Sequence, residues 1–148
     1  MIPWPHTPKM NATLTGIEEP TTRPSMYMEM LQAFSLKYEH AMEKEPVHPD
    51  ADTRELRIRL MREELKELID AMDMKDMIEV ADGLADLLYV VFGTAVAYGI
   101  PMDAIFGEVH RSNMTKSMHK DEGGKSIKGP DFEKPQLREV LHRHGWLG

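Results

Sequence analysis

Carboxylates recur at helical spacing in two neighbouring segments of the chain. Glu63, Glu64 and Glu67 lie in the stretch RELRIRLMREELKELIDAMD, and Glu79, Asp82 and Asp86 lie in EVADGLADLLYVVFGTAVAYG. At 100° per residue the three glutamates of the first stretch fall within about 100° of arc, in line with an apolar stripe of the same segment. The acids of both segments therefore share a face with residues expected in the core.

Two such helices packed side by side would gather four to six carboxylates, and oxygen-rich clusters of this kind bind Mg²⁺ or Mn²⁺. The second helix cannot neutralise its own acids, because no Lys or Arg lies between Asp76 and His110. Burying unpaired carboxylates costs several kcal/mol each or forces protonation. Taken alone, REELKEL is typical of a solvated helix face with i,i+4 ion pairs. The matched stripes on consecutive helices favour a metal site instead.

The elements that must position these acids are helices. Ser25 can cap the first, Asp50 or Asp52 the second, and Pro101 suits the first turn of the fourth. Gly99 suits the residue that follows the third helix. No segment alternates with the period of a strand. We therefore expect an all-α bundle of four to five helices at about 25–43, 50–73, 76–98, 101–113 and 135–144.

The domain organisation follows from the prolines and from the apolar third helix. Residues 1–24 hold five of the ten prolines and predict an irregular arm, followed by a single domain over 25–148. A helix that is apolar on nearly every side must be covered on all sides. Either a self-contained bundle or a homodimer that buries this helix between subunits would cover it.

Charge and composition narrow the function classes. The net charge is −7, which disfavours non-specific binding to a nucleic-acid polymer. Cysteine is absent, so disulfides, thiolate nucleophiles and Cys-based zinc sites are excluded. The apolar run 84–98 is too short for a comfortable membrane span, and the first residues do not read as a signal peptide. We expect a cytoplasmic protein that binds no membrane.

The combination of REELKEL, DGLADLLYVVFGTAVAYGIP and EVHRSNMTK over about residues 55–135 resembles the MazG-like all-α nucleoside triphosphate pyrophosphohydrolases. It is most similar to their short, single-domain branch, which includes dimeric dUTPase-like proteins. The resemblance implies an intertwined homodimer, with a tetramer as the alternative. It also implies Mg²⁺-dependent cleavage of a nucleoside triphosphate, dUTP among the candidates, between the α and β phosphates, giving a monophosphate and pyrophosphate.

The family signature pairs a Glu-x-x-Glu on one helix with a Glu-x-x-Asp on the next. By resemblance, Glu64, Glu67 and Asp86 are metal ligands, Asp82 is the fourth, and Glu63 is the candidate base. The chain departs from the signature three residues before Asp86, where Gly83 replaces the family glutamate. The identity of the fourth ligand and the number of metal ions stay open for this reason.

The substrate also needs cations, and HRSNMTK followed by a Gly/Lys-rich loop could supply them. Side chains there can grip phosphate or bond a base or sugar, although basic residues at a helix C-terminus often only complement its dipole. Phe34 could stack on the base, and a core role is its ordinary alternative. The predicted substrate-binding residues are Arg111, Asn113, Lys116, Lys125, Lys128 and Phe34.

Two alternatives remain beside the Mg²⁺-dependent triphosphate pyrophosphohydrolase. One is a pyrophosphohydrolase for a related substrate such as phosphoribosyl-ATP, which would use the same carboxylates. The other is a non-catalytic helical interaction module, in which Gly83 would mark lost metal chemistry.

Overall fold

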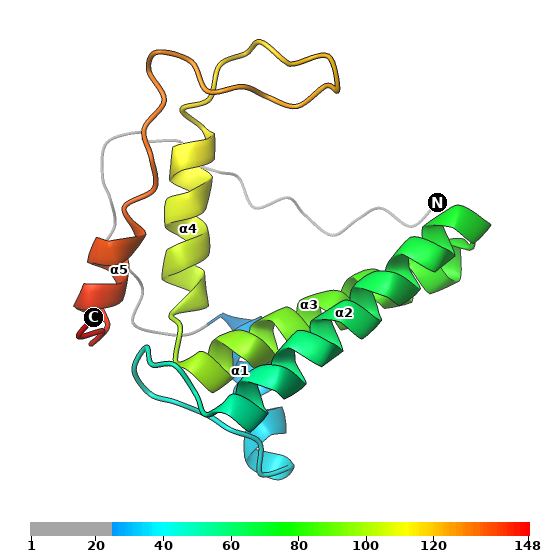
Figure 1. The fold of residues 1–148 in the computed structure, drawn as a ribbon, viewed down its shortest axis with the longest axis vertical. Coiled ribbons are helices and arrows are strands. Elements are labelled where there is room, and N and C mark those ends of the chain that lie inside the picture. Colours follow the sequence, from blue (N-terminus) through cyan, green and yellow to red (C-terminus); the bar gives the residue numbers. More distant parts are fainter. Residues whose placement is uncertain (1–24) are drawn as a thin grey trace.

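The computed structural model describes residues 25–148 (Figure 1). Five helices make up this part of the chain, as predicted, and the fold is all-α. Extended structure in the described residues is limited to an isolated bridge between Lys120 and Ser126. The predicted arm 1–24 lies outside the described residues. The helices are α1 Met26–Lys37, α2 Ala51–Met74, α3 Met77–Tyr98, α4 Met102–Asn113 and α5 Leu137–Arg143.

The start of α1 is confirmed and its predicted end is wrong. Ser25 is the N-cap, and its side chain accepts a hydrogen bond from the Met28 N–H. The helix ends at Lys37 rather than near residue 43, because Glu39 takes a left-handed conformation with φ 55°. The chain then turns onto α3, where the Glu43 N–H donates to the Val96 carbonyl. These tertiary bonds leave no room for a longer helix.

The long hairpin of α2 and α3 dominates the fold (Figure 1). Asp50 and Asp76 cap the two helices, and their carboxylates accept from first-turn N–H groups. The helices run antiparallel in a register set by close approaches at two glycines. Gly83 lies against the backbone of Leu68, and Gly93 lies against the side chain of Arg57.

The apolar core lies at the base of the hairpin, where α1 packs on α3. Its buried members are Met28 and Leu31 from α1 and Ala95 and Val96 from α3. The α4–α5 pair stands beside this base, and the Ser25 N–H donates to Asp103 of α4 at 2.8 Å. The far end of the hairpin extends away from both groups (Figure 1).

The turn from α3 to α4 depends on Gly99. This residue has φ +64°, and a Cβ there would overlap the Glu45 carbonyl oxygen. Gly99→Ala should therefore destabilise the protein by about 3 kcal/mol, since left-handed strain costs about 1–2 kcal/mol and overpacking about 1–3 kcal/mol. Thermal unfolding measures the loss. Gly107→Ala is the control, because Gly107 lies within α4 with open space around it and should gain helix stability. Equal melting temperatures for the two variants would contradict this account.

Within residues 25–148 the first half of α3 is largely exposed. The exposed apolar side chains of the hairpin include Ile78, 78% exposed, and Leu88, 55% exposed. The α3 helix is long and apolar enough to cross a membrane, but core helices of soluble proteins can have the same length and composition. The other large exposed side chains here are Leu65, Ile69, Met72, Met74, Met77 and Leu84.

Candidate active site

Glu64 lies at the centre of the carboxylate cluster, on the face of α2 that meets α3. Burial raises the pKa of its carboxyl, and the negative charges of Asp86, Glu67, Glu63 and Asp82 raise that pKa further, in this order. The shift involves acids of both helices and no cation. The charges of four other acids thus act on Glu64 across the two helices, whereas Glu79, which the sequence also placed on the stripe of α3, does not contribute.

The donor set fits a hard divalent cation, because it is made of carboxylate oxygens only. In residues 25–148 no three acidic or histidine side chains converge closely enough to hold one ion. Four of the five acids are exposed and free to change rotamer, and Glu64 is half-buried. Glu63 also faces the exposed Arg59 guanidinium at 3.9 Å.

The departure at Gly83 has a physical reason in this chain. Gly83 is buried, and a Cβ at this position would lie 3.1 Å from the Leu68 Cα. A glutamate here would push the helices apart and would point into α2 rather than into the cluster. Asp82 lies one residue earlier, is exposed, and contributes to the pKa shift of Glu64. The position of the family glutamate is thus used here for close helix packing.

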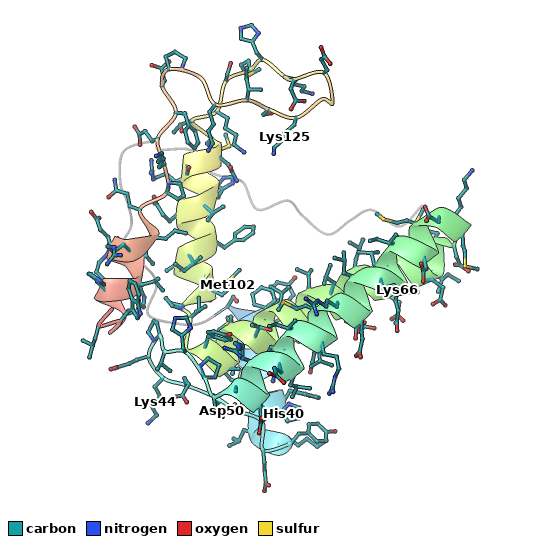
Figure 2. All side chains as sticks on the ribbon, in the orientation of Figure 1. His40, Lys44, Asp50, Lys66, Met102 and Lys125 are labelled. Carbon is teal, nitrogen blue, oxygen red and sulfur yellow. The ribbon has the colours of Figure 1, made fainter. Side chains whose placement is uncertain are left out.

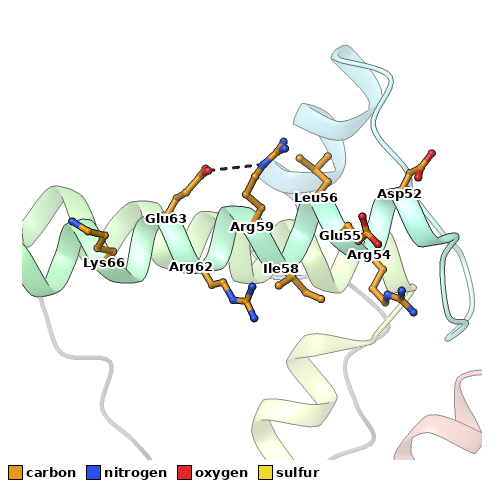
Figure 3. Close-up of a pocket in the computed structure, with 9 residues that line it drawn as sticks. All are labelled: Asp52, Arg54, Glu55, Leu56, Ile58, Arg59, Arg62, Glu63 and Lys66. Carbon is orange, nitrogen blue, oxygen red and sulfur yellow. Dashed lines mark ion pairs between the residues drawn. The ribbon is translucent and has the colours of Figure 1, made fainter.

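A shallow groove runs along the outer side of α2 (Figure 3). Of the predicted site residues only Glu63 lines it, beside cations such as Arg59 and Arg62. All of its lining residues come from α2, so it is a surface furrow rather than an enclosed pocket. It lies apart from the contact between Glu64 and Asp86, and we assign it no role in catalysis.

Arg111 has protein partners at the end of α4. Its guanidinium donates to Glu108 at 2.9 Å and also to Glu133, and these bonds raise the pKa of Arg111. Glu108 in turn accepts from the Gln136 N–H at 2.8 Å. The guanidinium therefore ties α4 to the segment before α5. Its predicted role in substrate binding would require these bonds to break.

The Gly/Lys-rich segment forms an ordered hairpin-like loop. The Lys125 N–H donates to the Asp121 carboxylate at 2.8 Å, and Gly124 takes φ +82° at the turn. Lys128 lies over the Phe132 ring with its Nζ 4.9 Å from the centroid. Figure 2 shows Lys125 beyond the end of α4, apart from Lys66 on α2.

The predicted cations and the carboxylates are thus not gathered within one chain. Asn113 is the last residue of α4 and is exposed, and Lys116 follows it half-buried. None of these groups contributes to the pKa shift of Glu64.

Phe34 belongs to an aromatic cluster next to the acids. The centroid of its ring lies 5.3 Å from that of Tyr89, in an edge-to-face arrangement, and 4.7 Å from that of Tyr38, in a tilted arrangement. His40 also packs edge-on against the Phe34 ring. Tyr89 lies one helical turn after Asp86, which places a half-exposed ring beside the carboxylates. Sequence reasoning missed Tyr38, His40 and Tyr89, although the spacing from Asp86 to Tyr89 was a usable signal.

The raised pKa of Glu64 makes a prediction for stability without divalent ions. A carboxyl whose pKa lies above its ordinary value of 4.5 binds its proton more tightly in the folded protein. Glu64 therefore opposes folding once the pH rises past that value, and the effect vanishes at lower pH. With a chelator present, the melting temperature of Glu64→Gln should be higher than that of the parent at pH 7 and equal to it near pH 4. A parent that melts higher at both pH values would contradict this.

The helical fold, together with a match to a family model, defines the class, an all-α nucleotide pyrophosphohydrolase of the MazG-like superfamily. A sequence model of the phosphoribosyl-ATP pyrophosphohydrolase family matches residues 29–113. The match covers more than half of the chain, and the chain belongs to this family. It includes all five acids and ends before the Lys-containing loop.

A second comparison concerns a viral protein. The chain is 41% identical over 51 residues to a protein of Acanthamoeba polyphaga mimivirus described as "Uncharacterized protein L479". The aligned segment covers 34% of this chain and 20% of the viral protein. The chain thus spans about a fifth of the length of this curated relative.

Proposed function

We propose that the protein is a Mg²⁺-dependent pyrophosphohydrolase that cleaves a nucleoside triphosphate, such as dUTP, between the α and β phosphates. The observation that carries the proposal is the match to a pyrophosphohydrolase family over residues 29–113, a segment that includes Glu64, whose pKa is raised by burial and by acids of both helices. Glu64, Glu67, Asp82 and Asp86 would hold Mg²⁺, or Mn²⁺ in its place. Their positions fit the donor chemistry of such ions.

The chemistry at this site follows from charge. Bound divalent ions would offset phosphate charge and lower the pKa of a water molecule. Glu63, at the solvent side of the cluster, would accept the proton of the attacking water. The ring of Tyr89, with Phe34 behind it, would carry the base by stacking, a contact that tolerates several bases.

A homodimer would complete the site. The Lys-containing loop extends beyond the end of α4, apart from the α2–α3 hairpin (Figure 2), and in a dimer Lys116, Lys125 and Lys128 would reach phosphates bound by a second copy. The exposed apolar face of the hairpin supports this arrangement, because apolar patches of this size mark interaction sites. The same contact would cover α3.

The dimer makes its own prediction. Leu88→Asp would place a charge on the apolar face of α3 and should turn a dimer into monomers, with loss of activity. Light scattering after size-exclusion chromatography measures the mass. Leu147→Asp is the control, because Leu147 is 99% exposed near the C-terminus and should change nothing. A parent that is monomeric at high concentration would overturn the dimer.

The reaction is tested by incubating the protein with Mg²⁺ and each common ribo- and deoxynucleoside triphosphate, plus dUTP and phosphoribosyl-ATP. Products are separated so that monophosphate with pyrophosphate is distinguished from diphosphate with phosphate. Turnover to monophosphate and pyrophosphate that stops in chelator is the expected result. Turnover of phosphoribosyl-ATP alone would show that the substrate is the one for which the family is named. No turnover and no Mg²⁺ effect on melting would favour a non-catalytic helical module.

A further inference from the structure

Arg57 is a buried cation without a partner. The residue is 6% exposed, and its Nε is fully enclosed with no hydrogen bond. No ion pair or hydrogen bond reaches its side chain from residues 25–148, and burial alone lowers its pKa. An uncompensated buried charge costs several kcal/mol, so a guanidinium is retained in such a place only for a strong reason.

The guanidinium lies at the junction of three helices. Its Nη1 lies 3.0 Å from the point where a Cβ on Gly93 would stand, so a side chain at this position of α3 would crowd it. Leu31 of α1 lies 3.5 Å from the same point. Among the buried side-chain nitrogen and oxygen atoms of residues 25–148, Arg57 Nε alone lacks a hydrogen-bond partner.

Arg57 is aligned with the carboxylate cluster. It precedes Glu64 by seven residues, which is two helical turns, so both lie on one face of α2 about 10 Å apart along the helix. The facing residues on α3, Gly93 and Asp86, have the same separation in the sequence. One face of α2 therefore has carboxylates at one point and an unpaired guanidinium two turns away, where Gly93 of α3 approaches it.

We propose that Arg57 binds a phosphate oxygen at the pyrophosphate end of the substrate. This inference rests on the proposed function, which places the cleaved α–β bond at the carboxylates. The β and γ phosphates then extend along α2 toward Arg57, whose fork of N–H donors matches phosphate oxygens. The terminal phosphate supplies the counter-charge that residues 25–148 do not.

Pyrophosphate binding in a chelator tests the inference separately from catalysis. Without divalent ions the carboxylates repel anions, while Arg57 keeps its charge. Calorimetry should show pyrophosphate binding to the parent, weakened about tenfold to a hundredfold in Arg57→Met, the loss expected for one charged hydrogen-bonded contact. Glu64→Gln should bind pyrophosphate at least as well as the parent. Arg62→Met, an exposed cation on the same helix, is the matched control and should bind normally.

Melting temperatures provide the second readout. Arg57→Met removes an unpaired buried charge and should melt above the parent, whereas the loss of a purely structural arginine would lower the melting temperature. Arg57→Lys keeps the charge and should recover part of the pyrophosphate affinity. Unchanged pyrophosphate binding in Arg57→Met, or none in the parent, would overturn the inference. Failure of Mg²⁺-dependent turnover with pyrophosphate binding intact would instead overturn the proposed function alone.

Discussion

Glu64→Gln and Asp86→Asn should each lower pyrophosphohydrolase activity by more than about a hundredfold. That figure is the upper end of the loss seen when a metal ligand only loses its supporting partner, and a lost ligand should cost more. Both substitutions keep shape and remove charge at the point where α2 and α3 bring their acids together. Initial rates of pyrophosphate release under saturating Mg²⁺ measure the effect.

The control for this experiment is Glu55→Gln, an exposed glutamate on α2 that does not contribute to the pKa shift of Glu64. Its rate should match that of the parent. The Mg²⁺-induced rise in melting temperature should also disappear in the two site variants, because an ion that binds only the folded state stabilises it. Full activity in either variant would remove the carboxylate cluster from the mechanism.

Gly83→Glu, which restores the family signature, should destabilise the protein by more than about 3 kcal/mol and should not improve catalysis. Its Cβ would meet the Leu68 backbone at 3.1 Å, and overpacking costs about 1–3 kcal/mol before the burial of a carboxylate is added. For a chain of this size the melting temperature should fall by at least about 6 °C.

The control for this substitution is Ala81→Glu, two residues earlier on α3 at an exposed position. It adds the same side chain without touching Leu68 and should leave the melting temperature nearly unchanged. A Gly83→Glu variant that folds like the parent and hydrolyses nucleotides faster would show that the helices can separate, and that Asp82 is a poor substitute for the family glutamate.

The sequence predicted the helices well because their ends carry local signals. Ser25, Asp50 and Gly99 act at the positions where side-chain caps and a glycine after the third helix were expected. The end of α1 was predicted wrongly because it depends on the docking of residues 43–47 on α3, and this tertiary contact leaves no pattern in the local sequence. The five acids were predicted from helical periodicity, which places them on one face of each helix. Because α2 and α3 pack with these faces together, the acids influence one another across the hairpin.

The partners of the acids could not be predicted in the same way. Arg111 was expected at the substrate, but its ion pairs with Glu108 and Glu133 depend on how the segment before α5 returns along α4. Tyr89 and Arg57 lay within apparently ordinary amphipathic patterns. Their special positions depend on the packing of α1, which periodicity on α2 and α3 does not report.

The close approaches at Gly83 and Gly93 lie on either side of the pairing between Glu64 and Asp86. They fix the separation of the two helices before any ligand arrives. The backbone of the proposed site is therefore preorganised: a bound cation would need the acidic side chains to change rotamer, but it would not need to draw the two helices together. The absence of side chains at Gly83 and Gly93 thus sets the distance between the acids of α2 and those of α3.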